Sequence, residues 1–196
     1  MLQLLTRRLL SCDNVPAVLE SLLDTSFHTA GAQFGNIQLM NWDTGCLELA
    51  TQRGFRADFL EYFDRVRVDD GSACALALRQ RSEVVVEDVS IESGFSPLSR
   101  AVVLNAGVRA VQSLPMISTS GAFLGVLSVH FSTVCRPMRG ETEIVKSLVQ
   151  LAANTIISIR ARQDSFDMIR KTRETIATSR DLLLRMEKSG SFADAP

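Results

Sequence analysis

The spacing of apolar residues predicts a helix over residues 13–30. Asp13 and Asn14 are residue types that cap helices, and Pro16 follows near the first helical position, where its missing N–H costs nothing. Apolar side chains then recur at helical spacing, at Val18, Leu19, Leu22, Leu23 and Phe27. This pattern is typical of an amphipathic helix, and Gly31 favours its end near residue 30.

Two alternating segments, residues 36–42 and 46–52, predict a β-hairpin. Apolar and polar side chains alternate in both, and Asp43, Thr44 and Gly45 form the loop, with glycine where a left-handed conformation is needed. A loop of three residues places four apolar residues on one face of the hairpin: Ile37, Leu39, Leu47 and Leu49.

The middle of the chain predicts short elements followed by a second hairpin. We expect a strand over residues 84–86 and helices over residues 57–65, 72–79 and 98–105. The second hairpin has strands over residues 109–117 and 122–131. Pro115 cannot donate to the sheet ladder, so we expect an edge position or a bulge there.

The end of the chain predicts one long helix. Residues 141–188 contain no proline or glycine, which allows a helix about 70 Å long at 1.5 Å per residue. Residues spaced alternately four and three apart form a stripe along one face of this helix, which we call the seam. The seam is apolar in the first part of the helix and includes Arg162, Arg173 and Arg180 in the later part. The later apolar residues would face water in a single chain. We therefore predict a dimer interface at Phe166, Ile169, Ile176 and Leu183.

The order of these elements predicts one α+β domain with helical extensions. Strands joined by hairpins, with helices at both ends, favour an antiparallel sheet covered by helices. We divide the chain into a leader helix (residues 1–12), a domain (13–160), a helical extension (161–188) and a polar tail (189–196).

The composition excludes disorder and argues against a nucleic-acid partner. The 196 residues are 46% hydrophobic and 22% charged, as in a globular domain. The 21 Lys and Arg nearly balance the 22 Asp and Glu, which leaves no field to hold a polyanion or an anionic membrane. No apolar run reaches the roughly 20 residues that span a bilayer, so we expect no transmembrane helix.

The four cysteines are spread along the chain, at Cys12, Cys46, Cys74 and Cys135. They form no CxxC motif and no Cys/His pairing at the spacing of a zinc site, and no secretory signal precedes them. We predict reduced thiols in a cytoplasmic protein. Residues 1–12 contain Arg7, Arg8 and no acid. A mitochondrial presequence therefore stays the alternative to an amphipathic helix that packs on its own domain.

Several segments together resemble the GAF domain, a small-molecule-sensing module of bacterial signalling proteins. They are the hairpin of residues 34–55, the Gly-led helix of 70–78, the strand of 84–89, and the closing hairpin of 107–116 and 125–131. The likeness covers about residues 14–160 and is to GAF modules of sensor histidine kinases and PAS-containing regulators in particular. It implies about six antiparallel strands, a pocket between the sheet and the short middle helices, and parallel dimerisation through the terminal helices.

The pocket that the resemblance implies has mostly apolar candidate walls with a few polar groups to orient a ligand. The candidates are Leu39, Cys74, Asp88, Phe95, Leu98, Val102, Val111, Ser113 and Met116. Asp88 closes a strand just before a loop, so a role in capping the turn is the simpler interpretation for it.

Cys74 is the candidate for redox chemistry. It lies in the first turn of the helix over 72–79, where the helix dipole favours a thiolate. Free methionine sulfoxide reductases belong to the GAF family and carry one cysteine at the position of Cys74, but residues 90–99, where they carry another, contain none. A small buried side chain in the pocket is the simpler interpretation, and we expect neither Cys46 nor Cys135 within disulfide reach.

Other ligand classes of the family find little support. Residues 100–106 lack the cysteine that bilin-binding relatives use, and the residue set of cyclic-nucleotide GAF domains does not occur in its order. His28 and His130 have no Cys, Asp or Glu at ligand spacing, so we interpret both as structural and expect neither a metal nor haem.

The sequence therefore predicts a non-enzymatic regulatory module. It would bind a small ligand of unknown identity as a homodimer and signal through its helical extension to a partner such as a histidine kinase. Two alternatives remain: a redox enzyme or sensor based on Cys74, and a structural dimerisation module with a collapsed pocket.

Overall fold

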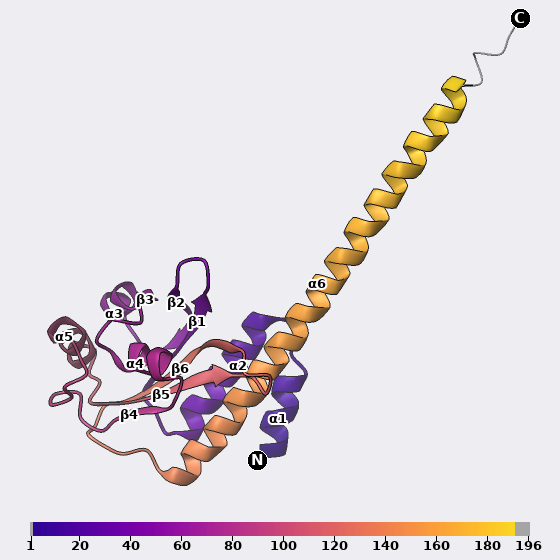
Figure 1. Ribbon diagram of the computed structural model, residues 1–196. Coiled ribbons are helices and arrows are strands. Elements are labelled where there is room, and N and C mark those ends of the chain that lie inside the picture. Colours follow the sequence, from indigo (N-terminus) through magenta and orange to yellow (C-terminus); the bar gives the residue numbers. More distant parts are fainter. Residues whose placement is uncertain (1, 191–196) are drawn as a thin grey trace, which may run out of the picture. The chain divides into compact units, whose positions relative to one another are not determined.

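Six antiparallel strands form one sheet in the order β3-β2-β1-β6-β5-β4 (Figure 1). This computed structural model describes the backbone of residues 2–190 and the side chains of residues 3 and 6–182. The strands are β1 (Phe34–Asn41), β2 (Cys46–Arg53), β3 (Arg65–Val66), β4 (Val84–Val86), β5 (Ala110–Ile117) and β6 (Phe123–Phe131). The expected α+β architecture is confirmed, and the two-residue β3 is a strand that the sequence pattern does not predict.

Helices pack on both faces of the sheet (Figure 1). On one face α2 contacts β1, β2 and β6, and α1 packs against α2. On the other face α4 contacts β5 and β6, while α3 contacts α5. The helices are α1 (Leu2–Leu10), α2 (Val15–Thr29), α3 (Ala57–Tyr62), α4 (Ala73–Gln80), α5 (Pro97–Asn105) and α6 (Arg139–Gly190).

Local signals in the sequence set the ends of α2 and α4. Asn14 Oδ1 accepts a hydrogen bond from Ala17 N at 2.9 Å, and Ser72 Oγ caps α4 in the same way at Ala75 N. Gly31 follows α2 with a φ of +63°, a left-handed conformation that glycine adopts without strain. The expected starts of both helices are confirmed.

The first hairpin has one more loop residue than expected. Asn41 pairs with Cys46, so the loop has four residues. Because side chains alternate between the two faces of a strand, a shift of one residue moves them to the opposite face. Leu47 therefore lies opposite Met40 and not on the face of Leu39. The prediction of one shared face is wrong for Ile37, Leu39, Leu47 and Leu49.

Pro115 lies where the sheet does not need its missing N–H. β4 pairs with β5 only from Val111 to Ser113, so β5 is an edge strand at Pro115 on that side. The register also shifts between Met116 and Ile117. The expectation of an edge position or a bulge at Pro115 is thus met by the edge position, and the bulge follows just after it.

The chain divides into two units, Met1–Ile157 and Ser158–Pro196. Among the described residues, α6 contains one stretch that would suit a membrane span by length and composition alone. However, 39% of that stretch is buried inside the structure. Its buried residues recur at helical spacing, at Val145, Leu148, Val149, Ala152, Ala153 and Ile156. Packing within the first unit accounts for these apolar residues.

Candidate functional site

A cavity lies between the central strands of the sheet and the layer formed by α3, α4 and α5. Its polar lining comes from all three central strands and from the start of α4: Asn36, Ser72, Cys74, Ser113, Ser128 and His130. Its apolar lining comes mostly from the helical layer: Phe59, Phe63, Ala73, Phe95, Val103 and Val111. The cavity therefore has a polar floor, in the sense that polar residues form it, and apolar walls, but most of the surface that faces the cavity is apolar.

The cavity is small. Its free volume is about 20 Å³, which is room for about one water molecule. Pockets for drug-sized ligands and cofactors hold about 300–1,000 Å³. The cavity described here is therefore much smaller than such a pocket.

The register of the sheet assembles the polar floor. Ser128 pairs with Asn36 of β1 on one side and with Ser113 of β5 on the other. The hydroxyls of Ser113 and Ser128 are 2.7 Å apart and hydrogen-bonded to each other. Because side chains alternate along a strand, His130 points the same way as Ser128. Residues from three strands thus meet on one face.

His130 is buried and neutral, and one of its ring nitrogens has no partner. The residue is 5% exposed, and burial lowers the pKa of the imidazole to about 3. Nε2 lies 2.9 Å from Asn36 Oδ1, an oxygen that can only accept, so Nε2 carries the proton and Nδ1 is left as an acceptor. Nδ1 makes no hydrogen bond. The structure describes all the other residues around the cavity. None of them has a buried side-chain nitrogen or oxygen that lacks a hydrogen-bond partner.

Aromatic rings hold the imidazole in place. The rings of Phe55 and Phe59 meet the ring of His130 at 90° and 88°, the edge-to-face arrangement that aromatic pairs prefer. Phe55 and Phe59 also stack on each other. The orientation of Nδ1 is therefore set by Asn36 on one side and by packed rings on the other.

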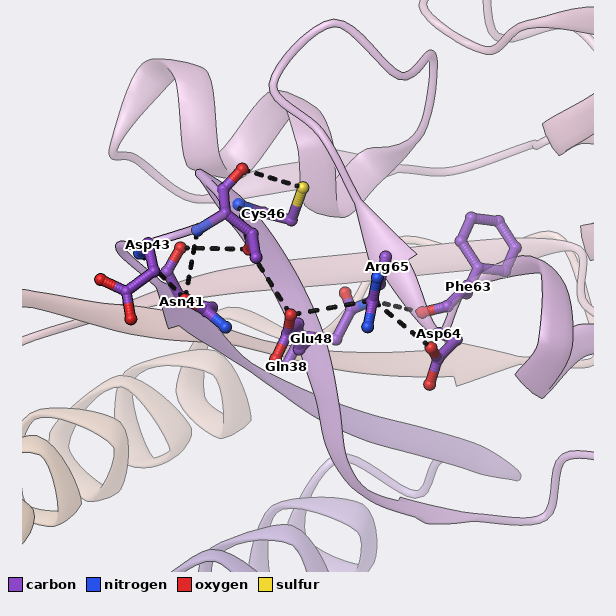
Figure 2. A network of polar contacts seen from close by, with 9 residues as sticks. Gln38, Asn41, Asp43, Cys46, Glu48, Phe63, Asp64 and Arg65 are labelled. Carbon is purple, nitrogen blue, oxygen red and sulfur yellow. Dashed lines mark hydrogen bonds and ion pairs between the residues drawn. The ribbon is translucent and has the colours of Figure 1, made fainter.

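A polar network fixes the segment that follows α3 (Figure 2). Gln38 donates from Nε2 to the carbonyl oxygen of Phe63 at 2.8 Å, and the ring of Phe63 lines the cavity. Arg65 forms an ion pair of 3.8 Å with Glu48, between β3 and β2. Figure 2 also shows Asn41, whose side chain accepts from the backbone of the hairpin loop. Of these interactions, the bond between Gln38 and Phe63 holds a residue of the cavity wall on the sheet.

The thiol of Cys74 is less acidic than its helix position suggests. Burial raises the pKa of Cys74, and the hydrogen bond with Ser72 Oγ at 3.3 Å only partly offsets this effect. The simpler interpretation of Cys74, a small buried side chain in the pocket, agrees with this burial. All four cysteines are free thiols. The described residues also contain no group of three or more His, Cys, Asp or Glu that could hold a metal ion.

The structure brings four of the nine candidate pocket residues to the cavity: Cys74, Phe95, Val111 and Ser113. It corrects Leu39 and Met116, which lie on the opposite face of the sheet. Each is an odd number of positions along its strand from a residue that lines the cavity, Asn36 in β1 and Val111 in β5.

Three further candidates, Leu98, Val102 and Asp88, also lie outside the cavity lining. Leu98 is 62% exposed, and Val102 packs against the core beside the cavity. The residue of α5 that lines the cavity is Val103. Asp88 accepts hydrogen bonds from the backbone and hydroxyl of Ser90, which lower its pKa. It acts as a cap for the turn after β4.

Sequence reasoning missed most of the polar floor. Ser128 and His130 are two polar residues with a spacing of two in an otherwise largely apolar strand, and that pattern marks a common face. Nothing in the sequence pairs His130 with Asn36, which lies 94 positions away. Further lining residues were also missed: Phe59, Phe63, Ser72, Ala73 and Val103.

The GAF domain family matches residues 6–156 of the chain. The chain therefore belongs to the GAF family, whose members are in general small-molecule-binding regulatory modules. No curated protein matches it.

Solved structures of GAF proteins share this fold at low sequence identity. A domain of a protein described as a two-component sensor histidine kinase, from Sinorhizobium meliloti 1021, has a TM-score of 0.64 and 18% identity over 76% of this chain and 94% of its own. A GAF domain/HD domain protein from Geobacter sulfurreducens has a TM-score of 0.65 and 20% identity over 82% of this chain and 99% of its own. Free methionine-R-sulfoxide reductase from Neisseria meningitidis, solved with its substrate, has a TM-score of 0.69 and 17% identity over 82% of this chain and 89% of its own.

Proposed function

We propose that this chain is a non-enzymatic, cytoplasmic regulatory module that binds a small molecule in the cavity and acts as a homodimer through α6. The observation that carries the proposal is a cavity in a GAF domain, lined by Asn36, Ser128 and His130 of the central strands. A histidine kinase is one class of partner, as one structural neighbour comes from such a protein.

The contacts of β5 offer a route from the cavity to α6. Val111 and Ser113 line the cavity, and Gln112 between them points to the opposite face. Gln112 Nε2 donates to Thr142 Oγ1 in the first turn of α6 at 3.0 Å. It also donates to Glu83 Oε1 at 2.7 Å. A ligand that shifts β5 therefore changes the contacts of the first turn of α6.

Replacing Ile169 and Ile176 together by aspartate is expected to give a folded monomer. Both side chains are largely exposed in the single chain, at 49% and 62%, and burying an isoleucine against a second copy contributes roughly 1.5–3 kcal/mol. We expect the dimer Kd to rise at least a hundredfold, because two such contacts are lost in each protomer. Sedimentation velocity measures the change, and circular dichroism checks the fold.

A matched control places the same added charge off the seam. Met168 and Thr175 lie on α6 seven residues apart, away from the seam, and are exposed, so Met168→Asp with Thr175→Asp should leave the dimer intact. If Ile169→Asp with Ile176→Asp stays dimeric, the interface lies elsewhere. Of the other expected interface residues, Phe166 is 71% exposed and the side chain of Leu183 lies outside the described residues. Arg162, Arg173 and Arg180 on the seam would weaken the dimer and keep it adjustable.

The alternative, a redox enzyme based on Cys74, makes a different prediction. The likeness to the Neisseria meningitidis reductase concerns the fold, whereas burial keeps the Cys74 thiol protonated and thiolate is the reactive form. We expect the purified protein to show no thiol-dependent reduction of free methionine sulfoxide, before or after Cys74→Ser. Activity that is present in the wild type and lost in Cys74→Ser would establish the alternative.

A further inference from the structure

The charged residues of the later part of α6 are divided between two sides of the helix. Residues 160–182 are all exposed in the single chain. Over this range the seam consists of Arg162, Phe166, Ile169, Arg173, Ile176 and Arg180. The positions that flank the seam hold Gln163, Ser165, Arg170, Thr172, Ala177 and Ser179. The seam and its flanks thus contain four arginines and no carboxylate.

The carboxylates of the same range all lie on the other side of the helix. They are Asp164, Asp167, Glu174 and Asp181. Arg170, on the flank, pairs with Asp167 at 2.9 Å. Arg162, Arg173 and Arg180 form no ion pair with any residue whose side chain the structure describes. The seam therefore presents three unpaired positive charges among its apolar residues.

A second copy of α6 does not supply the missing negative charge. It brings the same seam and the same flanks, and so the same four arginines and no carboxylate, in a parallel or an antiparallel pair. In a parallel pair in register, each arginine of the seam lies opposite its own copy. Like charges placed opposite each other across an interface cost affinity. Apolar contacts alone must hold such a homodimer together.

A helix with carboxylates at the matching positions removes this conflict. Carboxylates bind the guanidinium group through short, charge-assisted hydrogen bonds. The alternating spacing of four and three is the repeat by which one helix packs along another, and Phe166, Ile169 and Ile176 provide the apolar contacts between the arginines. Helices that lie on membranes instead keep their charged and apolar residues on separate faces. The mixed seam therefore favours an acidic helix over an anionic membrane.

We infer that the seam of α6 takes a helix of a second protein that carries Asp or Glu opposite Arg162, Arg173 and Arg180. In a parallel pair the carboxylates of that helix would be spaced by eleven and seven residues, with apolar residues between them. The inference rests on the helix face that the proposed function uses, and it names the kind of partner that displaces the second copy.

A charge-reversed copy of the chain serves as the probe for an acidic helix. Arg162→Glu with Arg173→Glu, the seam variant, keeps every apolar residue of the seam and places carboxylates opposite arginines of the wild type. The matched control is Arg160→Glu with Lys171→Glu. It makes the same change in charge at the same spacing of eleven residues, at exposed positions on the other side of the helix. Glutamate, arginine and lysine are similarly good helix formers, and circular dichroism checks that both variants fold.

Native mass spectrometry of equimolar mixtures distinguishes mixed dimers from like dimers by mass. Random exchange makes mixed dimers one half of all dimers. Wild type with the seam variant should give at least about tenfold more mixed dimers than like dimers, because each arginine then meets a carboxylate. The excess should shrink as the salt concentration rises. Wild type with the control variant should mix at random.

Random mixing of the wild type with the seam variant would overturn the inference, and so would an equal excess with the control. Flotation of the wild type with phosphatidylglycerol vesicles, lost in the seam variant and kept in the control, would also overturn it, because a membrane would then be the occupant. The proposed homodimer is judged separately, from the wild type alone. A wild type that is monomeric alone but pairs with the seam variant would remove the homodimer and support the acidic partner.

Discussion

Gly125→Ala is expected to cost about 3–5 kcal/mol of folding free energy, among the largest effects of a single methyl group. Gly125 lies in β6 with Leu39 of β1 and Met116 of β5 as its pairing partners. A Cβ atom there would lie 2.1 Å from the carbonyl oxygen of Gln38 and 2.9 Å from Cα of Leu39. Both are backbone atoms of the neighbouring strand, so the centre of the sheet must open to admit the methyl group.

Urea denaturation of the two glycine variants Gly125→Ala and Gly140→Ala measures this cost. Gly140 has nothing within 4 Å of the position its Cβ would take. Because alanine favours helix over glycine by up to about 1 kcal/mol, Gly140→Ala should be neutral or slightly stabilising. A Gly125→Ala protein within 1 kcal/mol of the wild type would contradict the described pairing of β1 with β6.

The stability of the domain should fall as the pH drops from 7 to 5, with His130 as a main cause. Burial lowers the pKa of His130 to about 3 in the folded protein, against about 6.5 in the unfolded chain. Below pH 6.5 the unfolded state therefore binds more protons than the folded state, and stability falls with falling pH. The loss is about 1 kcal/mol per pH unit, or about 2 kcal/mol between pH 7 and pH 5.

The comparison of wild type with His130→Gln isolates this effect. Glutamine stays uncharged at every pH, so the contribution of residue 130 to the slope disappears while the carboxylates titrate as before. Denaturant unfolding of both proteins at pH 7, 6 and 5 gives the two slopes. Equal slopes would mean that His130 titrates near its ordinary pKa, and that it is not buried as described.

Much of the fold could be predicted from the sequence because its signals are local. Asn14 and Ser72 cap helices through bonds to residues three positions away, and alternation identified the strands of both hairpins. The two-residue β3 was not predicted, since Arg65 and Val66 carry no pattern of their own and are held by pairing with β2.

The site was predicted less well because its geometry depends on register. One additional loop residue in the first hairpin moved Leu47 to the face opposite Leu39, and alternation alone excludes Met116 from a face that Val111 and Ser113 share. The bond between Asn36 and His130 joins strands that are far apart in sequence. Burial, a tertiary property, also raises the pKa of Cys74, against the effect of its position in the first turn of α4.

Native mass spectrometry of the full chain and of Ala73→Leu tests the central claim most directly, that the cavity holds a small molecule. Ala73 lines the cavity at the start of α4 and is buried, so leucine there fills the space without removing a polar group. The proposed function predicts a small retained mass on the wild-type protein that Ala73→Leu lacks. Identical spectra for the two folded proteins, each at the bare polypeptide mass, would contradict it.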